Sequence, residues 1–321
     1  MEKISVYVRA QDYVGDVTMQ YKKDIIEKVN KDYLEIYQSQ RYKLGDILFE
    51  ILEGVKKFDL KKSISNLKLL TQGVRLQKYN ISKQKRFIEF QDNYIAPKTA
   101  IYMALFGKYD KVLEPVIVSD NCDYYIFTDQ DIDKNSIWKK VDLSYEQNKY
   151  IEKLSAIEKN RFFKMLGYQY FSDYKFSIYI DANMEIYGEL SGFDVYANTR
   201  SGIAMYNHPA RKCIYDEARA CIIMGKVRKR DAKIQMRKYF DQGMPKNYGM
   251  CECNVIVRQT SNMICKKLMK EWWIEFNKSI VKRDQIIFPY ILWKNGININ
   301  EIGCLGENVD HDGKFRRKMH L

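Results

Sequence analysis

The sequence predicts an α/β domain built on a mostly parallel β-sheet, preceded by a helical N-terminal region. From Lys98 onward, short segments rich in β-branched and aromatic residues alternate with longer amphipathic segments. Apolar residues make up 46% of the 321 residues, which is enough for a sizeable core. Pro97 breaks the helical pattern, so we divide the chain into a helical region over 1–97 and an α/β domain over 98–321.

Two amphipathic segments before this boundary are expected to form helices. Apolar residues recur at helical spacing between Leu60 and Val74, and residues 39–52 show a similar pattern. Residues 61–89 contain eight Lys or Arg and a single Glu. One interpretation is that these helices pack on the main domain. The other is that their basic face contacts an anionic membrane surface.

The α/β domain is expected to contain six strands and four helices. Turn residues bound each short β-rich segment, and apolar periodicity marks each helix. The expected strands are 99–107, 123–129, 136–143, 176–181, 201–209 and 251–259. The expected helices are 151–171, 213–224, 261–278 and 284–294.

The formal net charge is +13, and residues 211–238 hold ten Lys or Arg against three acidic residues. Such basic fields attract nucleic acid, anionic lipid or phosphorylated substrates. A nucleic-acid-binding module was weighed, but no recognised motif is present and the basic residues are not interleaved with aromatics for base stacking. We therefore expect no nucleic-acid partner.

The chain start lacks a secretory pattern, and no apolar run reaches the ~18 residues that cross a bilayer. We therefore expect a cytoplasmic protein, with peripheral contact at the inner face of the cell membrane left open. The seven cysteines are expected to be reduced, and the C-x-C at Cys251 and Cys253 does not match a structural zinc knuckle.

Four of the expected strands have polar sequences at their carboxyl ends. The residues concerned are Gly107 and Tyr109 in FGKYD, Asp129 in FTD, Asp181 in DAN and His208 in NHP. Ligands of parallel sheets bind beyond the carboxyl ends of the strands. We therefore assign Gly107, Tyr109 and Asp129 to donor binding, and His208 to sugar or acceptor contact.

Asp181 and Asn183 stand two positions apart, so on an extended segment their side chains point the same way. Their oxygens suit Mn²⁺ or Mg²⁺, with His311 as a candidate third ligand. The alternative is an Asx-type turn without a ligand. Arg161 and Lys164 share a helix face and can meet a diphosphate bound near Asp181.

Three later segments supply further candidates. Gly313-Lys314 suits a phosphate, so we assign Lys314 to the diphosphate. Glu252 is a candidate catalytic residue and Asn254 a sugar or acceptor contact. Asp284 and Gln285 precede a helix and are candidate catalytic residues, although Asp284 can equally be a helix cap.

Taken in order, these segments resemble a glycosyltransferase-like family once catalogued only as a domain of unknown function. The family has plant members linked to mucilage polysaccharide and bacterial capsule-cluster members. The resemblance covers about Lys98 to Trp293 and rests on the segments ALFGKYD, YIFTD, NRFFKML, YIDANMEI, NHPARKCIYDEA, YFDQGMP, GMCECNVIVR, WW and RDQIIFPY.

The resemblance implies a GT-A fold that binds a nucleotide sugar through a DxD metal motif. Asp181 and Asn183 would be the DxD equivalent, with asparagine in place of the second aspartate, and Arg161 and Lys164 would face the diphosphate. Asp284-Gln285 also resembles a pair in glycogenin-type galactosyltransferases. Residues 311–314 match their C-terminal His-x-x-Gly-x-x-Lys only loosely.

The predicted function is metal-assisted transfer of a hexose-type sugar from a nucleotide donor, UDP-linked, to a surface polysaccharide or lipid-linked glycan. Retention and inversion of the sugar configuration both stay open. The alternative enzyme is a metal-dependent hydrolase acting on a lipid-linked substrate.

Overall fold

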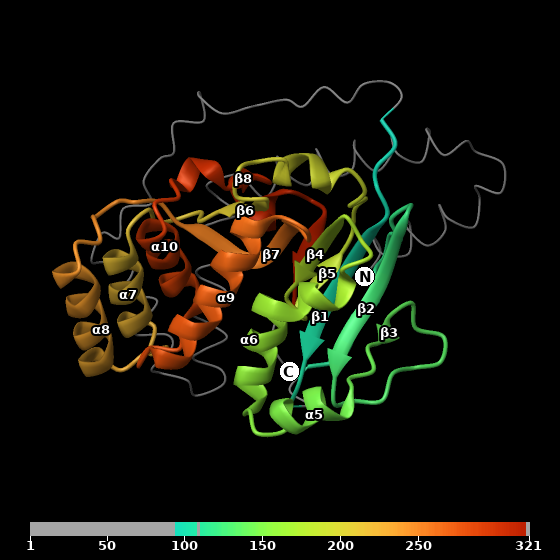
Figure 1. The fold of residues 1–321 in the computed structure, drawn as a ribbon, viewed down its shortest axis with the longest axis horizontal. Coiled ribbons are helices and arrows are strands. Elements are labelled where there is room, and N and C mark those ends of the chain that lie inside the picture. The colour runs from blue at the N-terminus through green and yellow to red at the C-terminus, as the bar shows by residue number, and fades with distance from the viewer. Residues whose placement is uncertain (1–93, 108–109, 319–321) are drawn as a thin grey trace, which may run out of the picture.

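The computed structural model describes residues 94–107 and 110–318, which form an α/β domain (Figure 1). Its main sheet has the strand order β3-β2-β1-β4-β7-β6-β8. The strands β1 to β4 run parallel, β7 is antiparallel to β4 and β6, and β8 is parallel to β6. The predicted α/β class with a mostly parallel sheet is confirmed. The predicted N-terminal helices lie outside the described residues.

All six segments expected to form strands contribute to this sheet. Its strands are β1 (Thr99–Leu105), β2 (Cys122–Thr128), β3 (Lys139–Lys140), β4 (Phe176–Ile180), β6 (Ile203–Asn207), β7 (Cys251–Gln259) and β8 (Gly303–Cys304). A second antiparallel sheet pairs β5 (Met184–Ile186) with β9 (Phe315–Arg317). The strand expected over 136–143 is reduced to β3, two exposed lysines at the sheet edge.

The helices are α5 (Tyr145–Ile151), α6 (Ala156–Leu166), α7 (Ile214–Ile223), α8 (Lys229–Asp241), α9 (Met263–Lys278) and α10 (Asp284–Lys294). The 3₁₀ segments are η2 (Gly167–Phe171), η3 (Phe193–Ala197), η4 (Ile299–Glu301) and η5 (Val309–His311). Helices α5 and α8 are not among the helices predicted from the sequence. The single helix expected over 151–171 is wrong: Ser155 caps α6 in a capping box with Glu158, and the chain tightens into η2 at Gly167.

Both faces of the sheet are buried, so every residue of β1 is inaccessible to solvent. Tyr102 packs in the cluster that contains Phe163 of α6 and Trp272 of α9, and these helices cover one face (Figure 1). Met103 packs in the opposite cluster with Met184 of β5 and Phe315 of β9. Because apolar side chains occupy both faces, polar groups are left to the strand ends, where the candidate site lies.

Candidate active site

The Asp-Ala-Asn segment directly follows β4 at the carboxyl edge of the sheet. The N–H of Asp181 donates to the carbonyl of Asn254 at 2.8 Å, and the N–H of Met184 donates to the carbonyl of Asp181 at 2.9 Å. The segment is therefore a tight turn, and the extended geometry we assumed for it is wrong. Asp181 and Asn183 nevertheless both line one cavity, so the turn does not exclude a ligand role.

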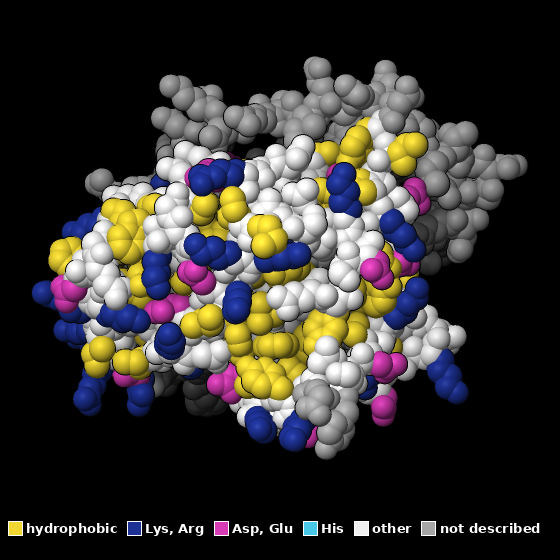
Figure 2. All heavy atoms as spheres, in the orientation of Figure 1, with side chains coloured by type: hydrophobic (Ala, Val, Ile, Leu, Met, Phe, Trp, Pro, Cys, Tyr) yellow, Lys and Arg dark blue, Asp and Glu magenta, His cyan; other side chains and the backbone are white. Residues whose placement is uncertain are grey.

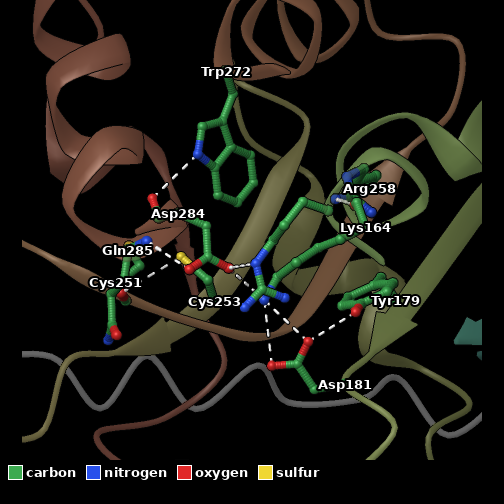
Figure 3. Close-up of polar contacts among 10 residues, drawn as sticks. Lys164, Tyr179, Asp181, Cys251, Cys253, Arg258, Trp272, Asp284 and Gln285 are labelled. Atoms are coloured by element: carbon green, nitrogen blue, oxygen red, sulfur yellow. Dashed lines mark hydrogen bonds and ion pairs between the residues drawn. The ribbon is translucent and has the colours of Figure 1, made fainter. Parts of the chain in front are cut away.

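The ammonium group of Lys164 lies between two carboxylates in this cavity (Figure 3). Its Nζ is 3.0 Å from Oδ1 and 3.3 Å from Oδ2 of Asp181, and 2.8 Å from Oδ2 of Asp284. The hydroxyl of Tyr179 also donates to Oδ1 of Asp181, at 2.8 Å. Lys164 is only 1% exposed, and a charge buried this deeply needs such partners.

Helix α6 and strand β7 position the cations. Arg161, one helical turn before Lys164, has its Nε 3.3 Å from Oδ2 of Asp284. The fully buried Arg258 of β7 donates from Nη2 to the carbonyl of Lys164 at 2.6 Å and from Nη1 to the hydroxyl of Tyr102 at 2.9 Å. The backbone that carries Lys164 is thus tied to two strands of the sheet.

Asp284 is the first residue of α10 and is 4% exposed. Burial raises the pKa of its carboxyl, but the charges of Arg161, Lys164 and Arg283 outweigh burial and hold the pKa below its usual range. The N-cap of α10 is Arg283 and no side chain caps this helix, so the alternative role of Asp284 as a helix cap is wrong; Asp284 accepts the N–H of the adjacent Gln285 at 3.0 Å. This carboxylate stays ionised and offsets part of the positive charge around it.

The opposite wall of the cavity comes from β7 and the C-terminal strand β9. Arg317 of β9 donates from Nη2 to Oε1 of Glu252 at 3.1 Å, and its Nε bonds Asp310 at 3.1 Å. Within the described residues, Oε2 of Glu252 and Oδ1 of Asn254 are buried without a hydrogen-bond partner. Burial raises the pKa of Glu252, although the nearby Arg317 opposes this. This wall therefore holds acceptor oxygens that lack a protein donor.

The cavity between these walls has a volume of about 430 Å³. The basic residues that line it are Arg161, Lys164, Lys226, Arg283 and Arg317. The acidic lining residues are Asp110, Asp181, Glu252 and Asp284. Asn160, Asn183, Asn254 and Gln285 add amides. A cavity so polar and rich in fixed cations suits a phosphorylated, hydroxyl-rich ligand.

Eight of the residues assigned from sequence line this cavity together. They are Arg161, Lys164, Asp181, Asn183, Glu252, Asn254, Asp284 and Gln285. The assigned Tyr109 lies outside the described residues. The N–H of Gly107 donates to Oδ2 of Asp129 at 3.3 Å, just beyond the ends of β1 and β2. Neither residue lines the cavity.

The other three assigned residues also lie outside the cavity lining. The Nζ of Lys314 is 5.9 Å from the ring centre of Phe193, and the carbonyl of Lys314 accepts the N–H of Tyr187. His311 ends η5, and the structure does not bring it into the lining with Asp181 and Asn183. Their assignment to phosphate and metal stays a prediction.

His208 is 4% exposed and serves a structural contact at the start of α7. Its Nδ1 accepts the N–H groups of Ala210 and Arg211, each at 3.1 Å, and its Nε2 is 3.4 Å from Oε2 of Glu217. Burial raises the pKa of Glu217, but the hydrogen bond with His208 and the charge of Arg211 bring it down to about 2. This network fixes the turn between β6 and α7.

Several lining residues escaped the sequence analysis. Arg283 adjoins Asp284, and Asn160 adjoins Arg161, so each lay beside an assigned residue. The side-chain amide of Asn160 makes two hydrogen bonds with the backbone of Phe106. It accepts the N–H at 3.1 Å and donates to the carbonyl at 3.3 Å. Arg317 reaches the cavity because β9 pairs with β5, a pairing that no local pattern indicates.

The side-chain oxygens at the turn are of the chemical type that binds a hard divalent cation. The side chain of Asp181 is 27% exposed, and Asn183 and the unpartnered Oδ1 of Asn254 line the same cavity. Both oxygens of Asp181 lie within hydrogen-bond reach of Lys164, and the described residues contain no group of three His, Cys, Asp or Glu suited to a metal. Bound phosphate and water would have to complete the coordination.

The chain belongs to the TOD1/MUCI70 glycosyltransferase-like domain family, whose model matches residues 88–302. This confirms the family resemblance drawn from the sequence. The match spans both walls of the cavity except Arg317 and Asp310. No curated protein sequence matches the chain.

Solved glycosyltransferase structures show a distant likeness. Mouse xyloside xylosyltransferase 1 in its apo form is 9% identical with a TM-score of 0.38, over 70% of this chain and 95% of that one. The bifunctional glycosyltransferase WbbM is 9% identical with a TM-score of 0.38, over 67% of this chain. The chain spans only 40% of the length of WbbM. The galactosyltransferase LgtC, solved with donor and acceptor sugar analogues, is 11% identical with a TM-score of 0.32, over 60% of this chain and 70% of that one.

Proposed function

We propose that this protein transfers a hexose-type sugar from a UDP-linked donor to a surface polysaccharide or lipid-linked glycan. The observation that carries the proposal is the buried Lys164, held between Asp181 and Asp284 in a cation-lined cavity. In sugar transfer from a nucleotide sugar, negative charge builds on the departing diphosphate. Cations fixed beforehand in a buried site stabilise that charge without having to reorganise.

Arg161, Lys164 and Arg283 are the cations assigned to the diphosphate. The single negative charge of Asp284 offsets part of their positive charge in the free enzyme. All four residues lie within the range 88–302 that the family model matches.

A divalent cation, Mn²⁺ or Mg²⁺, is assigned to the oxygens of Asp181 and Asn183. When bound, it would supply further positive charge to the diphosphate. Asn254 lies across the turn and lines the same cavity, and its buried Oδ1 has no hydrogen-bond partner among the described residues. The side chain of Asn254 can join the coordination shell of the metal or bind a sugar hydroxyl.

Glu252 is better suited than Asp284 to accept a proton from the acceptor hydroxyl. The pKa of Asp284 is lowered by three cations, so this carboxylate is a weak base. The pKa of Glu252 is raised by burial, and its Oε2 has no partner among the described residues. A general base works best when its pKa approaches the working pH.

The test is product analysis with a panel of UDP-sugars, with and without Mn²⁺, in the presence and absence of a glycan acceptor. Transfer predicts a new glycosidic product that depends on the acceptor and on one donor. Free sugar released at the same rate without an acceptor would favour a hydrolase and contradict the proposal.

A further inference from the structure

Helix α8 exposes a basic face at one end of the molecule. Arg230, Lys233 and Arg237 are exposed and recur at helical spacing, with the exposed Lys229 beside them. Figure 2 shows Lys and Arg side chains gathered over the end of the molecule that α8 forms in Figure 1. Within the described residues, Lys229, Arg230 and Lys233 have no acidic side chain in ion-pair contact.

Two apolar side chains interrupt this basic face. Ile234 is 47% exposed and Phe240 is 54% exposed. The guanidinium carbon of Arg237 lies 5.9 Å from the centre of the Phe240 ring, so charge and apolar surface are adjacent. An exposed helix face that combines basic and large apolar residues is typical of helices that lie in a membrane interface.

The opposite face of α8 is firmly held by the domain. Tyr239 stacks on Tyr290 of α10 with ring centres 3.9 Å apart. The amide of Gln235 donates to the hydroxyls of Tyr239 at 3.0 Å and Ser279 at 3.2 Å, and its oxygen accepts the N–H of Val281 at 2.8 Å. The outward residues are therefore not needed to anchor the helix. Their exposure is a fixed property of the fold.

We propose that the outward face of α8 docks the protein on an anionic phospholipid surface. The positive charge supplies the attraction to anionic headgroups, and Ile234 and Phe240 can enter the boundary with the acyl chains. A soluble polyanion, such as an acidic glycan, would use the cations but gain little from the apolar pair. None of the helices in the described part of the chain has the length and apolar character of a membrane span.

The position of α8 relates this surface to the active site. Lys226 lines the cavity and stands three residues before the first residue of α8. A membrane bound at α8 would therefore lie near the side of the cavity that Lys226 forms. The inference does not depend on sugar transfer being the reaction, because lipid binding and catalysis are measured separately.

The experiment is sedimentation of the full chain with phosphatidylcholine vesicles, with and without phosphatidylglycerol. We expect binding only to the anionic vesicles. The triple variant Lys229→Gln/Arg230→Gln/Lys233→Gln should bind at least about tenfold more weakly, because each basic residue near such a surface changes binding by roughly fivefold. The matched control is Lys266→Gln/Lys267→Gln/Lys270→Gln, which removes three exposed charges from α9 and should change binding less than about twofold.

A second variant separates lipid from a soluble polyanion. Ile234→Ser/Phe240→Ser should weaken vesicle binding severalfold and leave binding to polygalacturonate unchanged. The inference is overturned if the α8 triple variant binds vesicles as well as the α9 control does. It is also overturned if the chain binds polygalacturonate but not anionic vesicles, which would make α8 a glycan-binding surface.

Discussion

The two walls of the cavity differ in how their charges are satisfied. On the Lys164 wall (Arg161, Lys164, Asp181 and Asp284), each charge has an opposite partner within 3.3 Å. On the β7 wall (Glu252, Asn254 and Arg317), two buried oxygens have no hydrogen-bond partner among the described residues. The charges of the first wall pair with one another without a ligand, whereas the second wall contains buried acceptors without a donor. We infer that the Lys164 wall is preorganised for the diphosphate and that the β7 wall receives the reacting groups.

The largest effect is expected from Lys164→Met. Removing the cation leaves Asp284 with less compensation in a buried site, which typically costs about 3–5 kcal/mol of folding free energy. Loss of one preorganised charge should also lower kcat by about 10²–10³. Urea denaturation and initial-rate kinetics measure the two effects.

Lys153→Met is the control, because Lys153 is exposed just before α6. It should change stability by less than about 0.5 kcal/mol. If Lys164→Met keeps both wild-type stability and wild-type kcat, the Lys164 wall has neither role.

The second-largest effect is expected from Glu252→Gln, which should lower kcat about 10²-fold. The raised pKa means that ionised Glu252 is disfavoured in the folded protein. Its contribution to stability is therefore present below the unfolded pKa and lost as pH rises through the folded value. The variant should gain stability relative to wild type as the pH rises above 4.5, measured by thermal unfolding.

The pH dependence of the rate separates the two walls. Wild-type kcat/KM should fall on the acid side with a midpoint above 4.5, because protonated Glu252 cannot accept a proton. The pKa of Asp284 is lowered, so its stabilising charge persists until the pH falls further. An acid limb that is unchanged in Glu252→Gln would exclude Glu252 as the base.

Some residues of the two walls could be predicted from the sequence, because they lie on continuous strand and helix patterns. The buried run of β4 and the helical pairing of Arg161 with Lys164 are local signals, and so were found. The ends of parallel strands meet at one edge, which predicted a site at Asp181, whereas Asp284 was placed in the same site through the family resemblance. The pairing of Lys164 with two carboxylates was not predictable, because it depends on how α6 lies relative to the end of β4 and the start of α10.

Long-range pairings limited the rest of the prediction. Arg317 belongs to the site only because β9 pairs with β5, more than a hundred residues earlier in the chain. His208 was assigned to the ligand because it follows a strand, but its ring is used by backbone N–H groups and Glu217. Helix α8 was read only as a basic cluster, since its buried residues Ala232, Gln235 and Tyr239 include a polar side chain that weakens the apolar pattern.

A smaller effect is expected from Asp181→Asn. This change keeps the size of the side chain but removes the negative charge assigned to the metal, so the half-saturating Mn²⁺ concentration should rise at least about tenfold. Rates measured across a Mn²⁺ titration test this. An unchanged Mn²⁺ dependence would remove Asp181 from the metal site.

The smallest effect is expected from Asn254→Leu. Because Oδ1 of Asn254 has no partner among the described residues, its loss should change folding stability by less than about 1 kcal/mol. The KM for donor or acceptor should rise about tenfold if the oxygen binds a ligand hydroxyl. A stable variant with unchanged KM would show that this oxygen does not contact a substrate.

The most direct test is isothermal titration of the wild-type chain and Lys164→Met with UDP in the presence of Mn²⁺. The account predicts that UDP binds the wild-type cavity and binds the variant at least about tenfold more weakly, while both proteins give cooperative unfolding transitions at the titration temperature. Equal UDP affinity in the two folded proteins, or no UDP binding by the wild type, would contradict a diphosphate site at the Lys164 wall.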